Sequence, residues 1–363
     1  MRVREPQRLR ESELPGSQVA RCSSGQPGNS ATGQPVLAIT PPFLAMATIQ
    51  NALDPAGVQA GRIASLWNGY MVVLATVYVI VILWMFVAVW RSHKNAAPRI
   101  SESEERPHAI TVGVGVALTT LTLIGLLVAS VATGSAVGTY GDKKPNALEI
   151  DVTGHQWWWE VQYPDPEPDK AFKTANEIHI PLHRPVLLRL ATRDVIHSLW
   201  IPNLNGKRDL IPGRVNKLWI EADRPGVYRS QCAEFCGLQH AHMALVVVAE
   251  SNDKYQQWKT HAQSPANDPV TPQQRHGRDL FLSLPCVNCH AITGVDAYAT
   301  LGPDLTHLAS RPTLAAGELL NTKGALGGWI VNAPAIKPGT MMPPNQIAST
   351  DLQDLLAYLE SLR

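Results

Sequence analysis

The chain has 363 residues, of which 17% are charged, and its formal net charge at pH 7 is +1. This length is enough for two or three domains. The nearly balanced charge gives no electrostatic reason to expect a nucleic acid as partner.

The N-terminal residues 1–60 carry the weakest structural signals. Residues 1–21 are polar and lack the apolar stretch of a signal peptide, whereas residues 36–49 are mildly apolar but interrupted by Pro41 and Pro42. We therefore expect a poorly ordered segment, with a degenerate signal as the alternative for its apolar part.

Two long apolar runs follow. The first, from Trp67 to Trp90, has no charged side chain and as a helix would measure roughly 36 Å, against about 30 Å of membrane hydrocarbon. The second runs from Ala109 to about Val137 and is also uncharged. They predict a transmembrane helical hairpin over residues 61–140, and a buried hairpin of a soluble domain is the alternative.

The loop between the two runs predicts their orientation. It carries the basic residues Arg91, Lys94, Arg99 and Arg106. Since Lys and Arg mark the cytoplasmic side of a membrane, both termini are expected on the periplasmic or outer side.

Residues 141–250 show short β-prone runs separated by turns rich in Pro and Gly. The runs cover residues 147–152, 177–180, 186–191, 217–221 and 245–249. Such a pattern predicts an antiparallel β-sandwich. The pattern alone does not separate a cupredoxin fold from an immunoglobulin-like one.

Soft metal ligands are concentrated at the end of this region. Cys232, Cys236, His240 and Met243 fall within twelve residues, and His197 lies 35 residues before the first cysteine. Thiolate, imidazole and thioether ligands together suit copper better than calcium, magnesium or manganese. A structural zinc site and a disulfide between the two cysteines are the alternatives.

A second motif, Cys286-Val-Asn-Cys289-His290, has the Cys-x-x-Cys-His spacing of covalent c-type haem attachment. A redox dithiol or half of a zinc site are the alternatives. Helices are expected over about 273–284 and 350–361, and Met341 and Met342 could each offer a thioether sulfur. The sequence thus predicts a linker over 251–272 and a small all-α domain over 273–363.

The cysteine and histidine cluster resembles the binuclear copper (CuA) centre of cytochrome c oxidase subunit II. The resemblance implies a cupredoxin fold in which Cys232 and Cys236 bridge two coppers. The remaining implied ligands are His197, His240, the weak ligand Met243 and the backbone carbonyl of Glu234. Asp194 is expected to brace His197.

Two further stretches support the same resemblance. The run Gly154-His-Gln-Trp157-Trp-Trp-Glu160 is similar to the family segment whose first tryptophan admits electrons to copper. We therefore expect Trp157 at a surface facing the donor. The residues around the haem motif resemble a small cytochrome c, which implies that Pro303 orients His290 and that Met342, or failing it Met341, is the second iron ligand.

The resemblance implies a membrane-anchored electron-relay subunit of a haem-copper oxidase in a bacterial inner membrane. Its partners would be oxidase subunit I, the other oxidase subunits and a donor such as cytochrome c, and the chain would have no oxygen-reducing site of its own. A magnesium ion held partly by Glu234 would lie at the interface with subunit I. The copper-bearing subunit of a nitric oxide reductase is the alternative.

The connector over residues 202–214 resembles the family segment that faces the catalytic subunit. Its charged residues Lys207, Asp209 and Arg214 would be interface charges, or else solvated turn residues. The sequence leaves the donor, the haem types of the partner and any proton-channel role of Glu104, Glu105 or His108 open.

Overall fold

The computed structural model describes residues 50–94, 105–142, 144 and 146–363. Residues 1–49 of the predicted N-terminal segment lie outside the described residues, as do Glu104 and most of the basic loop. The end of that segment differs from the prediction, because a helix already begins at Val58. The start of this helix is held by backbone contacts with a later loop.

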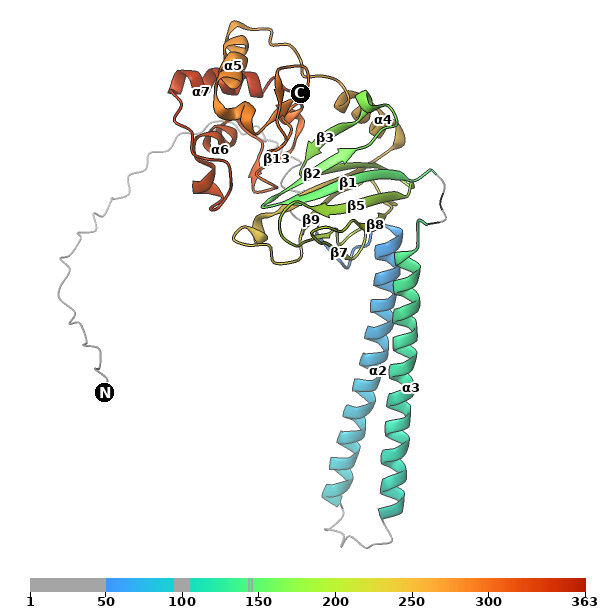
Figure 1. Cartoon of the computed structure of the whole chain (residues 1–363). Coiled ribbons are helices and arrows are strands. Elements are labelled where there is room, and N and C mark those ends of the chain that lie inside the picture. The colour runs from blue at the N-terminus through green and yellow to red at the C-terminus, as the bar shows by residue number, and fades with distance from the viewer. Residues whose placement is uncertain (1–49, 95–104, 143, 145) are drawn as a thin grey trace, which may run out of the picture. The chain divides into compact units, whose positions relative to one another are not determined.

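Two long helices form the predicted hairpin. Helices α2 (Val58–Lys94) and α3 (Glu105–Gly138) run side by side (Figure 1). The Tyr70 hydroxyl donates to Leu126 O over 2.8 Å, and Arg62 donates to Ala136 O over 2.7 Å. Their stretches Val58–Ser92 and His108–Gly138 are long and apolar enough to cross a membrane, and their most apolar windows bury none of their residues inside the chain. This exposure argues against the alternative of a buried soluble hairpin.

The central region is a sandwich of two five-stranded sheets (Figure 1). The first sheet has the order β3-β2-β1-β5-β8, with strands Phe172–Ala175, Trp158–Tyr163, Leu148–His155, Val186–Thr192 and Asn216–Ile220. The second has the order β4-β10-β9-β6-β7, with strands Glu177–Pro181, Ala244–Glu250, Gly226–Cys232, His197–Trp200 and Lys207–Leu210. The predicted sandwich is confirmed, but the sequence found only five of these strands.

The predicted antiparallel pairing holds for most neighbouring strands, but two pairs are parallel. Strand β1 pairs parallel to β5, with Leu148 opposite Val186, and β10 pairs parallel to β4, with Val247 opposite Ile178. In each pair the intervening chain contributes strands to a sheet before the partner strand is reached, so neighbours in the sheet are not neighbours in sequence. The pattern of single strands cannot reveal this.

Alternating inward side chains form the core between the sheets. Ile150 and Val152 of β1, Trp159 of β2 and Leu199 of β6 are fully buried. In β1 and β2 the polar neighbours of these residues are more exposed, as expected for strands with one face in the core. The apolar core reaches Cys232, Cys236 and Met243, so the predicted metal ligands belong to the packed interior.

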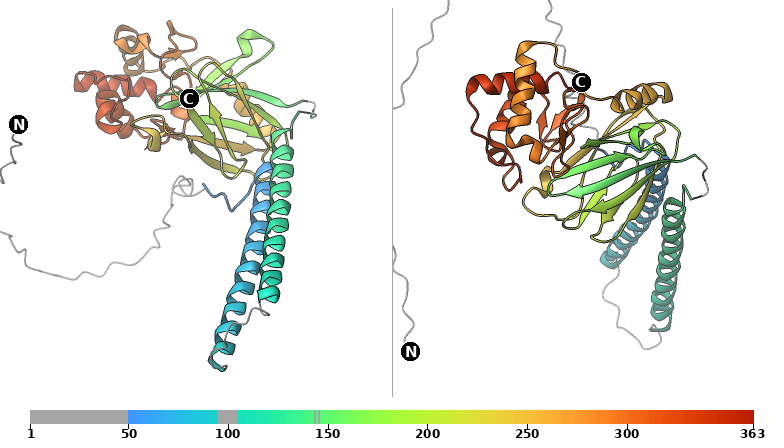
Figure 2. Two further views of the ribbon diagram at one scale, coloured as in Figure 1. Left: turned by 60° about the horizontal axis from the view of Figure 1, so that its bottom comes forward. Right: turned by 45° about the horizontal axis from the view of Figure 1, so that its top comes forward.

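Helix α4 (Asn252–Ala262) leaves the sandwich and is followed by a small helical region. Its main helices are α5 (Pro272–Ser283), α6 (Lys323–Ile336) and α7 (Ser349–Leu359), which gather together in Figure 2. Thr271 and Gln274 form a capping box that begins α5. Helices α5 and α7 cross at Gly277, where a Cβ atom would lie 2.0 Å from Asp354 O.

The sandwich is tied to both helices of the hairpin. The buried Asn203 accepts from the Asn51 backbone N–H over 3.2 Å and donates its amide to Asp54 O over 2.9 Å. On the other side, Gly141 lies against Trp219, because a Cβ there would come within 2.1 Å of the indole. Each helix therefore begins or ends on a fixed part of the sandwich.

Candidate metal centre

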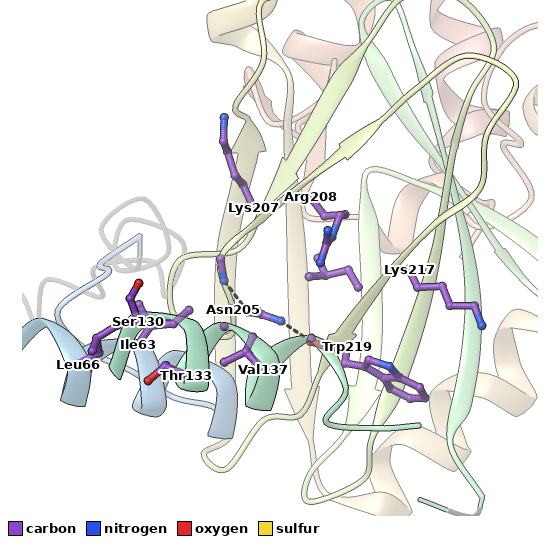
Figure 3. A pocket seen from close by; sticks show the side chains of 14 residues that line it. Ile63, Leu66, Ser130, Thr133, Val137, Asn205, Lys207, Arg208, Lys217 and Trp219 are labelled. Carbon is purple, nitrogen blue, oxygen red and sulfur yellow. Dashed lines mark hydrogen bonds between the residues drawn. The ribbon is translucent and has the colours of Figure 1, made fainter. Parts of the chain in front are cut away.

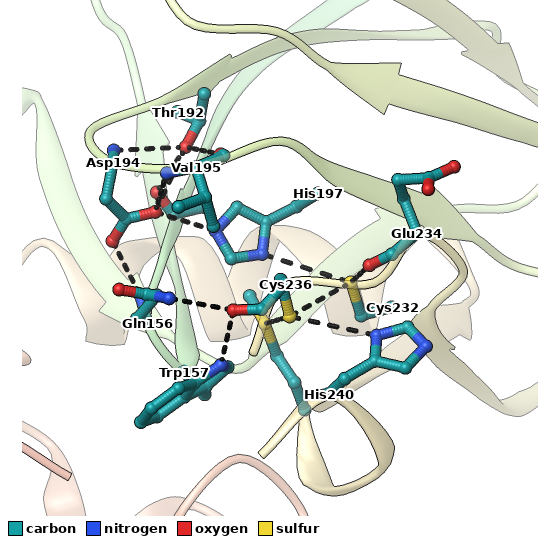
Figure 4. Close-up of polar contacts among 12 residues, drawn as sticks. Gln156, Trp157, Thr192, Asp194, Val195, His197, Cys232, Glu234, Cys236 and His240 are labelled. Carbon is teal, nitrogen blue, oxygen red and sulfur yellow. Dashed lines mark hydrogen bonds and ion pairs between the residues drawn. The ribbon is translucent and has the colours of Figure 1, made fainter. Parts of the chain in front are cut away.

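Five sequence-predicted ligand side chains meet at one end of the sandwich. Figure 4 labels the two cysteines and the two histidines among them. Cys232 Sγ lies 3.7 Å from Cys236 Sγ and 3.9 Å from His197 Nδ1. Cys236 Sγ in turn lies 3.7 Å from His240 Nδ1 and 4.0 Å from Met243 Sδ. The two sulfurs are thus central, with an imidazole nitrogen beside each, and their separation exceeds the roughly 2.05 Å of a disulfide bond.

Different elements supply these side chains. His197 begins β6 and Cys232 ends β9, two strands that are paired in the second sheet. Cys236 lies in the loop after β9, and His240 begins a short 3₁₀ helix that ends at His242. The Glu234 carbonyl oxygen lies 3.2 Å from Cys232 Sγ. Strand pairing therefore brings His197 across the 35-residue separation.

The ring of His197 is held from two sides. Asp194 Oδ1 lies 2.8 Å from His197 Nε2. Burial opposes ionisation of Asp194, but hydrogen bonds, above all from His197, lower its pKa. The Cα of Gly154 faces the same ring, since a Cβ there would lie 2.8 Å from His197 Cδ2. These contacts leave Nδ1 directed at the sulfurs (Figure 4).

The two thiols do not ionise independently of each other. The hydrogen bond from Cys236 lowers the pKa of Cys232, while the same contact, together with burial, raises the pKa of Cys236. One thiolate forms readily and the second is resisted, because two buried negative sulfurs would repel each other. A soft cation is what would stabilise both thiolates together, and this donor set fits copper.

Trp157 adjoins the sulfur cluster, but it is not at an open surface. Its indole N–H donates to the Cys236 carbonyl over 2.9 Å, and the Gln156 amide donates to the same oxygen over 2.8 Å. Only 8% of Trp157 is exposed. The expectation of a surface residue is wrong, because Gly339 of the helical region lies against the ring: a Cβ there would be 3.2 Å from the indole.

Glu234 and the connector lie beside the cluster. The Glu234 carboxylate is 3.9 Å from Lys207 Nζ, and both side chains are about half exposed. Lys207 and Arg208 also line a cavity of about 260 Å³ together with Lys217 and residues of α2 and α3 (Figure 3). Asn205 donates to Trp219 O over 2.6 Å beside this cavity. Two cations of the connector and one of strand β8 thus line the cavity beside the hairpin.

The second predicted site lies in the helical region. Cys286 lies on a short 3₁₀ helix (Pro285–Asn288), and Cys289 and His290 follow directly. His290 Nδ1 is 2.7 Å from Pro303 O, as the resemblance implies. Burial lowers the pKa of His290, so the neutral ring donates from Nδ1 and keeps Nε2 as a free ligand atom.

The two candidate methionines differ in their surroundings. Met341 is 73% exposed, whereas Met342 packs against the core of the helical region. A thioether that approaches a buried haem iron must come from the inner side, which favours Met342. Gly302 packs closely against the His290 ring, since a Cβ at Gly302 would lie 2.8 Å from His290 Cε1. Two thiols, an imidazole held by a carbonyl and an inward thioether fit a c-type haem.

Sequence reasoning missed three residues of these sites. Gly154 and Gly302 let His197 and His290 pack without a Cβ in the way, and Lys337 reaches the backbone of Trp157. Gly154 opens the tryptophan-rich run of residues 154–160, and Gly302 directly precedes Pro303, so both glycines lie next to residues that the sequence did single out. Nothing in the sequence signals the contact of Lys337.

The architecture defines a class: an electron-transfer protein that joins a cupredoxin-like sandwich with copper-type ligands to a cytochrome c domain behind two apolar helices. Two family models match the chain, cytochrome c oxidase subunit II periplasmic domain over residues 167–250 and cytochrome c over residues 274–363. The matched regions contain the two ligand sets described above.

Relatives along most of the chain agree. Cytochrome c oxidase subunit 2 of Alkalihalophilus pseudofirmus is 33% identical over 86% of this chain and 90% of its own length. The same subunit of Bacillus sp. strain PS3 is 29% identical over 76% of this chain and 80% of its own length. A crystal structure of the periplasmic domain of subunit II of Bradyrhizobium japonicum cytochrome oxidase is 30% identical, with a TM-score of 0.31, over 33% of this chain and 96% of that one.

The chain belongs to the cytochrome c oxidase subunit II family and carries a C-terminal cytochrome c domain. It is therefore a subunit of an oxidoreductase that associates with subunit I in a haem-copper oxidase. The sandwich implies copper and the C-terminal domain implies haem. Family and helices together indicate an inner-membrane protein with a periplasmic domain.

Proposed function

We propose that this chain takes electrons from a donor cytochrome at a covalent haem c and relays them through a binuclear CuA centre. The acceptor is the catalytic subunit that reduces oxygen to water. The observation that carries this proposal is the position of Trp157 between a turn of the cytochrome domain and the Cys236 carbonyl. The relatives described above give the nitric oxide reductase alternative no support, so oxygen is the final acceptor in this proposal.

The chain's own residues supply both sets of ligands. Cys286 and Cys289 would hold the haem covalently, and His290 and Met342 would supply its iron ligands. Cys232 and Cys236 would hold the copper pair, together with His197, His240, Met243 and the Glu234 carbonyl. When bound, the haem and the copper pair each accept and release one electron.

Contacts across the domains give a short connection between the sites. Met342 lies three residues after Gly339, and the Gly339 backbone packs close to the Trp157 indole. The indole N–H then donates to Cys236 O, which belongs to a proposed copper ligand. The close approach of Gly339 to the indole and the hydrogen bond from the indole to Cys236 O support a short route between the two ligand sets.

The face around the connector is proposed to meet subunit I. Lys207 and Arg208 lie there with exposed side chains, and the Glu234 side chain is about half exposed. A single carboxylate is a poor magnesium site, because Mg²⁺ requires octahedral oxygen ligands. Glu234 would hold magnesium only together with oxygens of subunit I and water.

We propose domain boundaries at 61–140, 141–250, 251–272 and 273–363, with α2 and α3 spanning the inner membrane. Both termini and both metal domains then lie on the periplasmic side. Covalent haem attachment and copper binding on the same side as the donor are consistent with this orientation. Arg91, at the far end of α2, lies on the predicted cytoplasmic side.

The test is metal analysis and low-temperature EPR on the full chain, purified in detergent after maturation with haem and copper. We expect a copper pair and one haem per chain, with the multi-line hyperfine pattern of one unpaired electron shared by two coppers. A single copper, or zinc with a silent spectrum, would refute the binuclear centre.

The order of transfer is tested in the assembled oxidase by rapid mixing with reduced cytochrome c. The haem c absorbance should rise before the copper band is bleached. Reduction of copper ahead of haem c would refute the proposed order.

A further inference from the structure

One buried lysine has no role in the two ligand sets. Lys337 directly follows α6 and is only 2% exposed. No carboxylate of the described residues lies within ion-pair distance of its ammonium. A fully buried lysine without a carboxylate is rare, because removing the charge from water is costly.

Three backbone carbonyls accept hydrogen bonds from this ammonium. Lys337 Nζ donates to Trp157 O over 2.8 Å, to His242 O over 2.8 Å and to Ala315 O over 2.9 Å. An ammonium has three donors, so all of them are used. Two of the acceptors belong to the sandwich and the third to the cytochrome domain, and Lys337 therefore joins the two domains.

The Lys337 side chain remains protonated at neutral pH despite its burial. Burial lowers the pKa of Lys337 to about 8, while the acidic Glu318 opposes the fall. Because this pKa still lies above 7, the amine remains protonated and can donate all three hydrogen bonds. Replacing it would leave three carbonyls without a donor in a closed interface, which is unfavourable for each of them.

Other contacts near Lys337 also hold the cytochrome domain at this position on the sandwich. Gln239 donates to Pro338 O over 2.8 Å, and the Ala244 backbone N–H donates to Ala316 O over 2.9 Å. His242 Nδ1 lies 2.6 Å from Glu318 Oε2. These groups flank the ammonium on both domains, so the turn at residues 337–339 is held at one position on the sandwich.

The left-handed backbone of Gly339 completes the contact. Its φ is +87°, and a Cβ there would lie 3.2 Å from the Trp157 indole and 3.1 Å from Leu238. The turn can lie flat on the ring only because this residue has no side chain. Lys337, two residues earlier, bonds to the backbone of the same tryptophan.

We propose that Lys337 is a positioning residue that fastens the methionine-side turn of the cytochrome domain onto Trp157. The electron-accepting face of the copper domain is then occupied by this chain's own cytochrome domain. A soluble donor must consequently deliver its electron to the haem domain and not to Trp157. This inference rests on the proposed function. Lys337 itself gains and loses no electron; one electron leaves the reduced haem and one reaches the oxidised copper pair.

The first test needs no cofactor chemistry. The full chain is treated with an amine-reactive reagent and the modified lysines are identified by mass spectrometry. Lys337 should be protected at least about tenfold relative to Lys323, which begins the same helix with its side chain 48% exposed. Equal labelling of the two lysines in the native chain would overturn the proposal.

The second test uses Lys337→Met, which keeps the length and removes the donors, with Lys323→Met as the matched control. Hydrogen exchange at the Ala244 amide, which is bonded across the interface, should quicken in Lys337→Met only. In the assembled oxidase, transfer from haem c to copper should slow by about tenfold or more, as the docked population falls. The KM for the donor and the haem spectrum should stay unchanged.

The outcomes separate the two proposals. Unchanged transfer and unchanged exchange in a folded Lys337→Met chain would overturn the role of Lys337 while the relay stands. Absence of copper or haem from the native chain would overturn the relay, whatever the labelling of Lys337 shows. If Lys337→Met fails to fold, protection of Lys337 in the native chain still decides the inference.

Discussion

The two ligand sets of this chain are supported in different ways. The copper-type cluster lies between paired strands, and Cys232, Cys236 and Met243 are buried in the sandwich core. The haem-type motif lies on a short 3₁₀ helix, where Cys286 and Cys289 are only partly buried. The first set is positioned by the fold, whereas the second relies on a small domain of short elements. The copper-type site within the large core is therefore preorganised, whereas the haem-type site within the small core depends on its ligand.

The largest expected effect concerns loss of each cofactor. In Cys286→Ser/Cys289→Ser, which cannot attach haem, we expect residues 273–363 to lose most of their hydrogen-exchange protection. A domain of about 90 residues buries little core without its prosthetic group. In Cys232→Ser/Cys236→Ser the sandwich should keep its protection. Equal loss of protection in both variants would refute the contrast.

The next effect concerns helix packing in the small domain. Gly277→Val places a side chain where a Cβ already meets Asp354 O at 2.0 Å. We expect the crossing of α5 and α7 to fail, at a cost of about 3 kcal/mol or more. Thermal unfolding followed by haem absorbance measures it. The control Gly324→Ala lies in α6 with nothing within 4 Å, and a destabilisation there would indicate that the clash is not the cause.

A smaller effect is expected in the copper cluster. Asp194→Asn removes the charge beside His197 but keeps the shape of the loop. Loss of such a supporting contact weakens metal affinity by about ten- to a hundredfold, and competition with a copper chelator measures it. Glu167→Gln, an exposed residue paired with Lys170, is the control. Equal copper affinity in the two variants would show that Asp194 does not support the site.

The smallest effect concerns pH. The hydrogen bond between His276 and Asp354 raises the pKa of His276 above 6.5 and lowers that of Asp354 below 3.8. Stabilisation from the pair is present between these two reference values. It is lost when pH rises through the raised pKa of His276 or falls through the lowered pKa of Asp354.

This dependence is measured as a difference in Tm. The haem domain should melt at a slightly higher temperature near pH 5.5 than near pH 8.5, and His276→Gln should remove that part of the difference. A pH dependence that is the same in native and variant chains would exclude the pair as its source.

The sequence predicted the candidate metal ligands and the apolar helices better than it predicted the strands and the contacts between domains. Cys232, Cys236 and His240 are close in sequence, so their motif predicts the cluster, and the helix-length apolar runs predict α2 and α3. Strand β7 (Lys207–Leu210) was missed because its first three side chains are polar and the strand lies at the edge of the sheet. Strand β9 was missed because Arg229 and Gln231 interrupt its apolar residues.

Contacts between domains lie beyond such patterns. The burial of Trp157 depends on Gly339, which lies 182 residues later. Neither residue type signals the other, since glycine and tryptophan meet here only through the packing of two domains. The three carbonyl partners of Lys337 could not be predicted either, because every residue has a backbone carbonyl and the sequence does not distinguish the ones that accept.

The attachment through Asn203 and Trp219 has a consequence for assembly. Asn203 bonds to the segment before α2, and Trp219 packs on Gly141 after α3. A hairpin whose two helices are each attached to the sandwich has little freedom to swing about that end, so little orientational entropy remains to be lost when subunit I binds. The height of the sulfur cluster above the bilayer is then set during folding of this chain alone, before any partner arrives.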